Sequence, residues 1–180
     1  MASYVLQNGI PVKIIPYDVT HANSLARNLF EGVSAETIMQ QRAELLAPGP
    51  EEVYSVCAIA NVKVVGVCTG VRRRWAGARH RIELLQVVVH DEFKKLGLAR
   101  QMMVEIARHF KERGVEILEI SVASDNSDAF LAYFKIGFQQ VGILRNGLKH
   151  DGQYADEVLL AMPIVDLLKW QSEIPHPKEY

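Results

Sequence analysis

The sequence predicts an α/β (α+β) fold in which one mixed, seven-stranded sheet is flanked by about four helices. The length of 180 residues suits a single domain with a full core, and 49% apolar with 23% charged residues is an ordinary globular composition. Apolar spacing changes along the chain in the order strand, two helices, three strands, helix, strand, helix, two strands. We expect residues 1–163 to form the domain and residues 164–180 to form an extension that packs on it or on a partner chain.

The first half of the chain supplies four of the expected strands. Strands are predicted at 11–16, 53–60, 63–71 and 81–89, and helices at 20–30 and 34–46. Ser34 is a residue type that caps helices at the start of the second one. Only Asn61 and Val62 separate the second strand from the third, which favours a hairpin.

The second half begins with an amphipathic helix from Leu98 that ends near Gly114. Beyond it we expect a strand, a short helix and two strands, at 116–123, 127–137, 138–144 and 155–162. The segment 145–154, "RNGLKHDGQY", is rich in turn residues and is predicted to be a loop.

Charge and cysteine content narrow the function classes. A net charge of −1 argues against indiscriminate nucleic-acid binding, which needs a large basic face. Cys57 and Cys68 lie in apolar segments without a His or Cys cluster, so we expect reduced core thiols and no metal site. The N-terminus does not resemble a signal peptide, and no stretch reaches the roughly 20 apolar residues of a membrane span. These features predict a cytoplasmic protein without a membrane partner.

The segment "FKKLGLA" (93–99) joins the strand at 81–89 to the helix that starts at Leu98. The first amides of a helix have no partner within it, and with the helix dipole they favour an anion. Gly97 would let a phosphate approach the backbone, and Lys94 and Lys95 would add positive charge. These residues therefore predict a diphosphate site, unless Gly97 only starts a helix and the lysines are solvated.

Two motifs resemble those of the GNAT N-acetyltransferase superfamily. Lys94-x-x-Gly97-x-Ala99 matches [QR]xxGx[GA], except that lysine replaces the usual Gln or Arg. The segment "NSDAFLAYFKIGF" matches Nxx[AS]xxxYxxxGF at Asn126, Ala129, Tyr133, Gly137 and Phe138. Together with the element order, the resemblance covers roughly residues 11–162. It implies a GNAT-like, mostly antiparallel sheet, acetyl-CoA as acetyl donor, an amine acceptor on a protein or small molecule, and a homodimer as one partner state.

The resemblance also implies residue roles. The backbone of Val87, Val88 and Val89 would pair with the pantetheine arm of acetyl-CoA, and Asn126 would hold the arm from the opposite strand end. Tyr133 would also contact the cofactor near its sulfur and act as general acid toward the leaving thiolate. The remaining cofactor-binding positions follow the chain around the diphosphate: Lys94, Lys95, Leu96, Gly97, Leu98, Ala99 and Arg100.

Glu83 is the candidate general base, because it lies in the otherwise apolar strand "IELLQVVV" where desolvation would raise its pKa. Its distance before Gly97 also resembles the histone-acetylating branch of the superfamily. Alternatively, Glu83 is a structural residue paired with Arg81, and a water chain removes the proton from the acceptor amine. Ribosomal-protein N-terminal acetyltransferases carry a Glu where this chain has Ser121, and Glu119 is two positions away.

Acceptor identity stays open in the sequence. The loop 72–81 holds five arginines and Trp75, which suits an acidic substrate, the cofactor 3′-phosphate, nucleic acid or a solvated hairpin tip. The segment "FEGVSAET" (30–37) resembles part of bacterial-type protein lysine acetyltransferases, but Arg42 falls one position late and Met39 and Leu45 are expected in the core. A non-catalytic acyl-CoA sensor on the same fold is the alternative to an enzyme.

Overall fold

The computed structural model describes residues 2–172 and contains, within them, one eight-stranded sheet. The strands lie side by side in the order β1-β2-β3-β4-β5-β6-β8-β7, and all neighbours are antiparallel except β5 and β6. Their bounds are β1 (Ala2–Val5), β2 (Pro11–Pro16), β3 (Val53–Ala60), β4 (Lys63–Arg72), β5 (Arg81–Val89), β6 (Ile117–Ala123), β7 (Gln139–His150) and β8 (Gln153–Pro163). The mixed, mostly antiparallel fold predicted from the sequence is confirmed.

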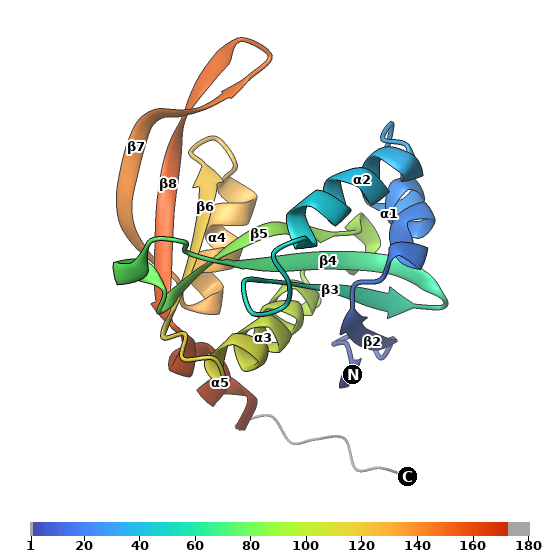
Figure 1. Cartoon of the computed structure of the whole chain (residues 1–180). Coiled ribbons are helices and arrows are strands. Elements are labelled where there is room, and N and C mark those ends of the chain that lie inside the picture. The colour runs from blue at the N-terminus through green and yellow to red at the C-terminus, as the bar shows by residue number, and fades with distance from the viewer. Residues whose placement is uncertain (1, 173–180) are drawn as a thin grey trace.

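Helices cover both faces of the sheet (Figure 1). They are α1 (Ala22–Asn28), α2 (Ala35–Leu46), α3 (Leu98–Lys111), α4 (Ser127–Ile136) and α5 (Ile164–Ser172), with short 3₁₀ turns η1 (Val19–His21), η2 (Ala76–Ala78) and η3 (Asp91–Phe93). The apolar stripe of α3 forms the larger core with one face of the sheet. The smaller core lies between α1, α2 and the other face. Ser34 caps α2 as predicted, since its Oγ accepts a hydrogen bond from the Thr37 amide at 3.1 Å.

The parallel pair β5–β6 holds together only at its start. Arg81, Ile82 and Glu83 pair with residues of β6, and no later residue of β5 does so. β6 instead pairs along its whole length with β8, so β5 runs away from it (Figure 1). Among the described residues, the separation leaves one backbone edge of β5 without a neighbouring strand from Leu84 to Val89.

A bulge interrupts β5 inside this separated stretch. The β4–β5 register shifts between Val67 and Thr69, and Gln86 has a left-handed φ of 52°. A bulge re-aims the side chains that follow it, and here Val87 packs on the larger core while Val88 packs on the smaller one.

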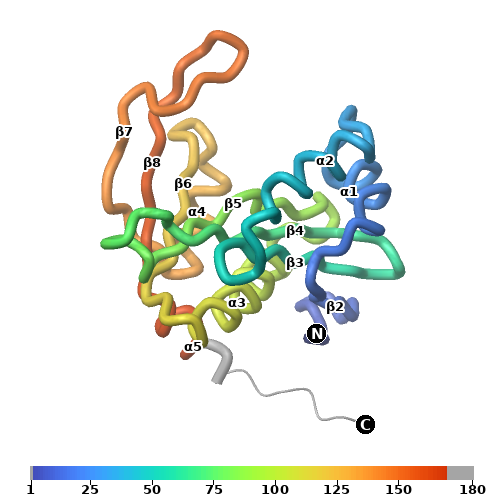
Figure 2. The backbone as a smooth tube through the Cα atoms, viewed as in Figure 1, coloured from blue at the N-terminus to red at the C-terminus, as the bar shows by residue number. Residues whose placement is uncertain are grey.

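Two strand predictions were wrong. Residues 145–154, expected as a loop, form the ends of β7 and β8, and only Asp151 and Gly152 turn between them. The polar residues there belong to a hairpin that is exposed on both sides and projects from the body (Figure 2). Because neither face is buried, apolar and polar residues do not alternate in this segment. The short β1, which adds the eighth strand, pairs with β2 and was not predicted.

The cysteines and the C-terminal segment fit the two cores. Cys57 and Cys68 are free and buried on opposite faces of the sheet, as predicted for core thiols. In the predicted extension 164–180, α5 buries Ile164 and Leu167 in the larger core, while residues 173–180 lie outside the described part. Within the described residues, no helix is long and apolar enough to cross a membrane.

Candidate active site

The junction between β5 and α3 has the geometry that the motif predicts. Gly97 is the N-cap residue of α3, with a left-handed φ of 85°, and it makes no side-chain cap to the first helix amides. The first helical hydrogen bond is made by Gln101, whose amide donates to the Gly97 carbonyl at 3.1 Å, so the earlier amides of the helix face outward. A Cβ built on Gly97 would meet no atom within 4 Å, which means open space beside these amides. Val87, Val88 and Val89 lie on the separated stretch of β5 that leads to this turn.

The basic residues of the motif differ in their environment. Lys94 is exposed and forms an ion pair with Asp91 at 2.5 Å, which also holds the pKa of Asp91 below its usual range. Lys95 is exposed, has a left-handed φ of 62°, and makes no ion pair within the described part of the chain. Arg100 lies half-buried on the first turn of α3, where burial lowers its pKa. Of the two lysines, Lys95 is the one that the structure leaves ready for an anion.

The second motif forms α4 and its ends. The Asn126 side chain caps the helix, accepting a hydrogen bond from the Ala129 amide at 3.1 Å. Tyr133 packs against the larger core, with its ring at an edge angle to Phe138. Burial, followed by the nearby Cys68 thiol, raises the pKa of Tyr133 to about 12. The phenol is therefore protonated throughout the neutral range.

Glu83 belongs to an ion-pair cluster at the point where β5 and β6 separate. It lies opposite Glu119 in the parallel register, and Arg73 bridges both carboxylates at 2.8 and 2.7 Å. Arg81, the partner considered for Glu83, instead lies 3.0 Å from Glu119. The Glu83 side chain keeps 25% of its surface exposed, so its setting is polar rather than the apolar one that the strand sequence indicates.

Most arginines of the loop 72–81 have structural partners. Besides Arg73 and Arg81, Arg79 pairs with Glu52, and Arg72 donates to the Arg113 carbonyl at 2.6 Å. Arg74 is exposed and makes no hydrogen bond or ion pair within the described residues, although its charge acts on Glu52. Trp75 beside it is 77% exposed. The loop therefore offers little free positive charge for nucleic acid.

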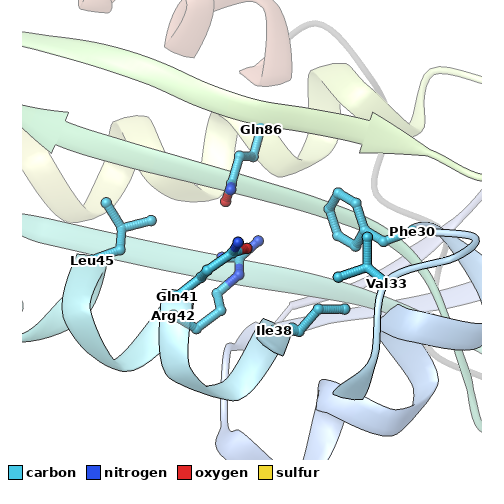
Figure 3. A pocket seen from close by; sticks show the side chains of 7 residues that line it. All are labelled: Phe30, Val33, Ile38, Gln41, Arg42, Leu45 and Gln86. Atoms are coloured by element: carbon cyan, nitrogen blue, oxygen red, sulfur yellow. The ribbon is translucent and has the colours of Figure 1, made fainter. Parts of the chain in front are cut away.

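A hollow lies between α2 and β5, next to the separated strand (Figure 3). The empty space within it, counted together with the adjoining open solvent, is about 340 Å³. Figure 3 shows the residues that line it: Phe30, Val33, Ile38, Gln41, Arg42, Leu45 and Gln86. Gln86, at the bulge, points from β5 toward Gln41 and Arg42. The next residue is Val87, so this hollow opens beside the stretch predicted to hold the thioester end of acetyl-CoA.

Arg42 is the least expected residue of this site. It is only 3% exposed and its guanidinium lies 5.1 Å from the Tyr17 ring centroid. Burial lowers its pKa. The prediction of core positions for Met39 and Leu45 was wrong, because Met39 is 42% exposed and Leu45 lines the hollow. Within the described residues no group of His, Cys, Asp and Glu could hold a metal ion.

Comparisons with known proteins decide the family. The profile of the acetyltransferase (GNAT) family matches residues 20–138. The chain belongs to the GNAT acetyltransferase family. The resemblance predicted from the two motifs is thus confirmed, and both motifs lie within the matched range.

Individual GNAT relatives are distant. A ribosomal protein bS18-alanine N-acetyltransferase of Salmonella typhimurium is 28% identical over 81 residues, which are 45% of this chain and 55% of that protein. This chain thus spans about half the length of the curated relatives it matches. Their name belongs to the branch that Ser121 argues against, so it does not decide the acceptor.

Solved GNAT structures share the fold at lower identity. An N-acetyltransferase from Staphylococcus aureus Mu50 has a TM-score of 0.71 at 15% identity, covering 85% of this chain and 98% of its own. The yncA protein of Salmonella typhimurium, solved with its cofactor acetyl-CoA, has a TM-score of 0.62 at 15% identity, covering 85% and 94%.

The sequence alone did not predict that Glu119 and Arg42 belong to the site. Glu119 reaches the Glu83 cluster only through the parallel register of β5 and β6, which no local pattern reveals. Arg42 carried a weak signal, since it is the one arginine in the amphipathic stretch 34–46, and it falls on the buried side.

Proposed function

We propose that this GNAT protein is an acetyl-CoA-dependent N-acetyltransferase that transfers acetyl directly to a primary amine of a small molecule or protein. One observation carries the proposal: β5 separates from β6 after Glu83 and leads to a helix start that has a left-handed glycine, no capping side chain and open space beside it. A backbone edge without a neighbouring strand suits an amide-bearing arm, and free helix amides suit a diphosphate. The two features occur in sequence, as an extended acyl-CoA requires.

The residues present fit acetyl-CoA. The β5 backbone at 87–89 would pair with the pantetheine arm, the turn at 95–100 would hold the diphosphate, and Lys95 would add charge. Lys94 would contribute less, because Asp91 already neutralises it. When bound, acetyl-CoA supplies an activated acetyl thioester.

Glu83 is the proposed general base. An alkyl ammonium has a pKa near 10.4, so the acceptor must lose a proton before it attacks at neutral pH. Arg73 holds the Glu83 carboxylate through Oε2 at the point where the two strands part, and the side chain is partly open to solvent. This partial exposure lets an amine or a water molecule reach the carboxylate, while Glu119 holds the same arginine from the other strand.

Tyr133 is the proposed general acid. Its phenol stays protonated because burial raises its pKa to about 12. A protonated phenol can hold a hydrogen bond to a leaving thiolate and return a proton to it. Asn126 would hold the arm from the start of α4, as the motif implies, while its side chain caps the helix.

The test is steady-state kinetics with an amine panel, following thiol release. Glu83→Gln and Tyr133→Phe should each lower kcat by about 10²- to 10⁴-fold while the affinity for acetyl-CoA changes little. Glu112→Gln and Tyr154→Phe are matched controls, because both residues are exposed and lie outside the site. Unchanged rates in Glu83→Gln would assign the base to a water chain, and acetyl-CoA binding without any turnover would favour a sensor.

A further inference from the structure

Arg42 presents an unused bidentate edge. Its Nη1 donates both of its hydrogen bonds to hydroxyls, to Ser55 Oγ at 2.7 Å and to Thr69 Oγ1 at 3.0 Å. Nη2 is buried without a hydrogen-bond partner, and Nε has none within the described residues. Nε and Nη2 form the planar fork of two parallel N–H groups that binds a carboxylate through both of its oxygens.

No acidic side chain neutralises this buried cation in the described part of the chain. Its neighbours are the hydroxyls, the face of Tyr17 and the thiols of Cys57 and Cys68. A buried charge is normally paired, because removing an unpaired ion from water is strongly unfavourable. An arginine 97% buried beside a hollow and lacking a counter-ion is therefore a candidate ligand contact rather than a simple packing residue.

The rest of the hollow limits what such a ligand can be. Its walls are apolar at Phe30, Val33 and Ile38, and the amides of Gln41 and Gln86 are the other polar groups (Figure 3). A ligand here would combine one anionic group with a short apolar chain.

We propose that the acceptor is a small primary amine that also carries a carboxylate, and that Arg42 binds this carboxylate in the hollow between α2 and β5. The inference rests on the proposed acetyltransferase function and names its substrate class. Ser55 and Thr69 hold the guanidinium through Nη1, which leaves Nε and Nη2 to bind the ligand carboxylate. Gln86 lines the hollow and precedes Val87 in β5. The acceptor amine would thereby lie next to the stretch of β5 that holds the thioester end.

The experiment compares acceptors that differ only in the carboxylate. L-leucine, L-phenylalanine and 6-aminohexanoate are each measured against the corresponding carboxamide, with acetyl-CoA saturating. A charge-assisted bidentate contact should give the best acid a kcat/KM about tenfold to hundredfold above its amide. The amide of an amino acid has the less basic amine and so the larger neutral fraction, which biases the comparison against this result.

Variants separate recognition from packing. Arg42→Lys keeps the charge but loses the fork, and should lower kcat/KM about tenfold for the acid and less than threefold for the amide. Arg74→Lys, the same change at an exposed position, should alter neither. Calorimetric titration of wild-type protein with each acid and its amide, in the presence of CoA, repeats the comparison without a variant.

The outcomes distinguish this inference from the proposed function. Equal rates and affinities for acid and amide, or equal losses for both in Arg42→Lys, would overturn the carboxylate site. A peptide with an amidated C-terminus that outperforms every acid would do the same and point to a protein acceptor. Absence of acetyl-CoA binding would overturn the proposed function itself, whatever the acceptors do.

Discussion

The replacement Gly97→Ala separates the cofactor role of this glycine from its structural role. Gly97 and Gly114 stand at the two ends of α3, with left-handed φ angles of 85° and 75°, and a Cβ on either would meet no atom within 4 Å. Alanine at each position should lower the free energy of unfolding by about 1 kcal/mol through backbone strain alone. For a domain of this size that corresponds to a fall in Tm of about 2–4 °C.

Only one of the two glycines should affect acetyl-CoA. A methyl group at Gly97 would occupy the open space beside the first amides of α3, where the diphosphate is proposed to lie. We expect Gly97→Ala to weaken CoA binding at least tenfold, or by about 1.4 kcal/mol, and Gly114→Ala to leave it unchanged. Isothermal titration with CoA measures both affinities. Equal CoA affinities in the two variants, at equal loss of Tm, would refute the assignment of the diphosphate to this turn.

Three further predictions test the packing and ionisation of the fold. Gly70→Ala would place a Cβ 2.6 Å from the Ile106 side chain. It should lower the free energy of unfolding, measured by urea denaturation, by about 1–3 kcal/mol. An unchanged urea midpoint would contradict the close packing of β4 on α3. Ser55→Ala removes one acceptor from the buried Arg42 guanidinium and should destabilise the protein by about 1–3 kcal/mol, whereas neutrality would mean that the hydroxyl does not hold Arg42. Burial raises the pKa of Cys68 from 9 to about 12, so its stabilising contribution is complete below pH 9 and is lost as pH rises toward 12. Between pH 8.5 and 10.5 the free energy of unfolding, measured with urea, should therefore fall by about 2 kcal/mol more in wild type than in Cys68→Ala. Parallel curves would contradict the buried thiol.

The sequence was informative wherever one face of an element is buried. The helix after Gly97 repeats its apolar residues at helical spacing because that side packs on the sheet, and its start and end were predicted closely. The hairpin at Asn61 and Val62 was predicted from spacing alone, and both residues have the left-handed φ angles of a tight turn. The hairpin at 145–154 was missed because neither face of it is buried, so its polar residues resemble a loop.

The site was predictable only where it is local in sequence. Gly97 and Tyr133 belong to contiguous motifs, so their neighbourhood followed from a few residues of chain. Glu119 lies beside Glu83 because β5 and β6 pair in parallel, the one such pair among the described strands. Arg42 reaches Ser55 and Thr69 from α2, on the face of the sheet opposite to α3. Such contacts depend on strand order and helix packing, which local patterns do not encode.

The measurement that tests the central claim most directly is the change in Tm of the purified protein with acetyl-CoA, beside ATP and NAD as controls. Acetyl-CoA at about 100 times its Kd should add roughly 2.7 kcal/mol to the free energy of unfolding, or about 5–10 °C in Tm, and neither control should match it. A shift confined to acetyl-CoA is the result that the β5–α3 geometry predicts. An unchanged Tm at millimolar acetyl-CoA would contradict both the diphosphate site at Gly97 and the proposed acetyltransferase.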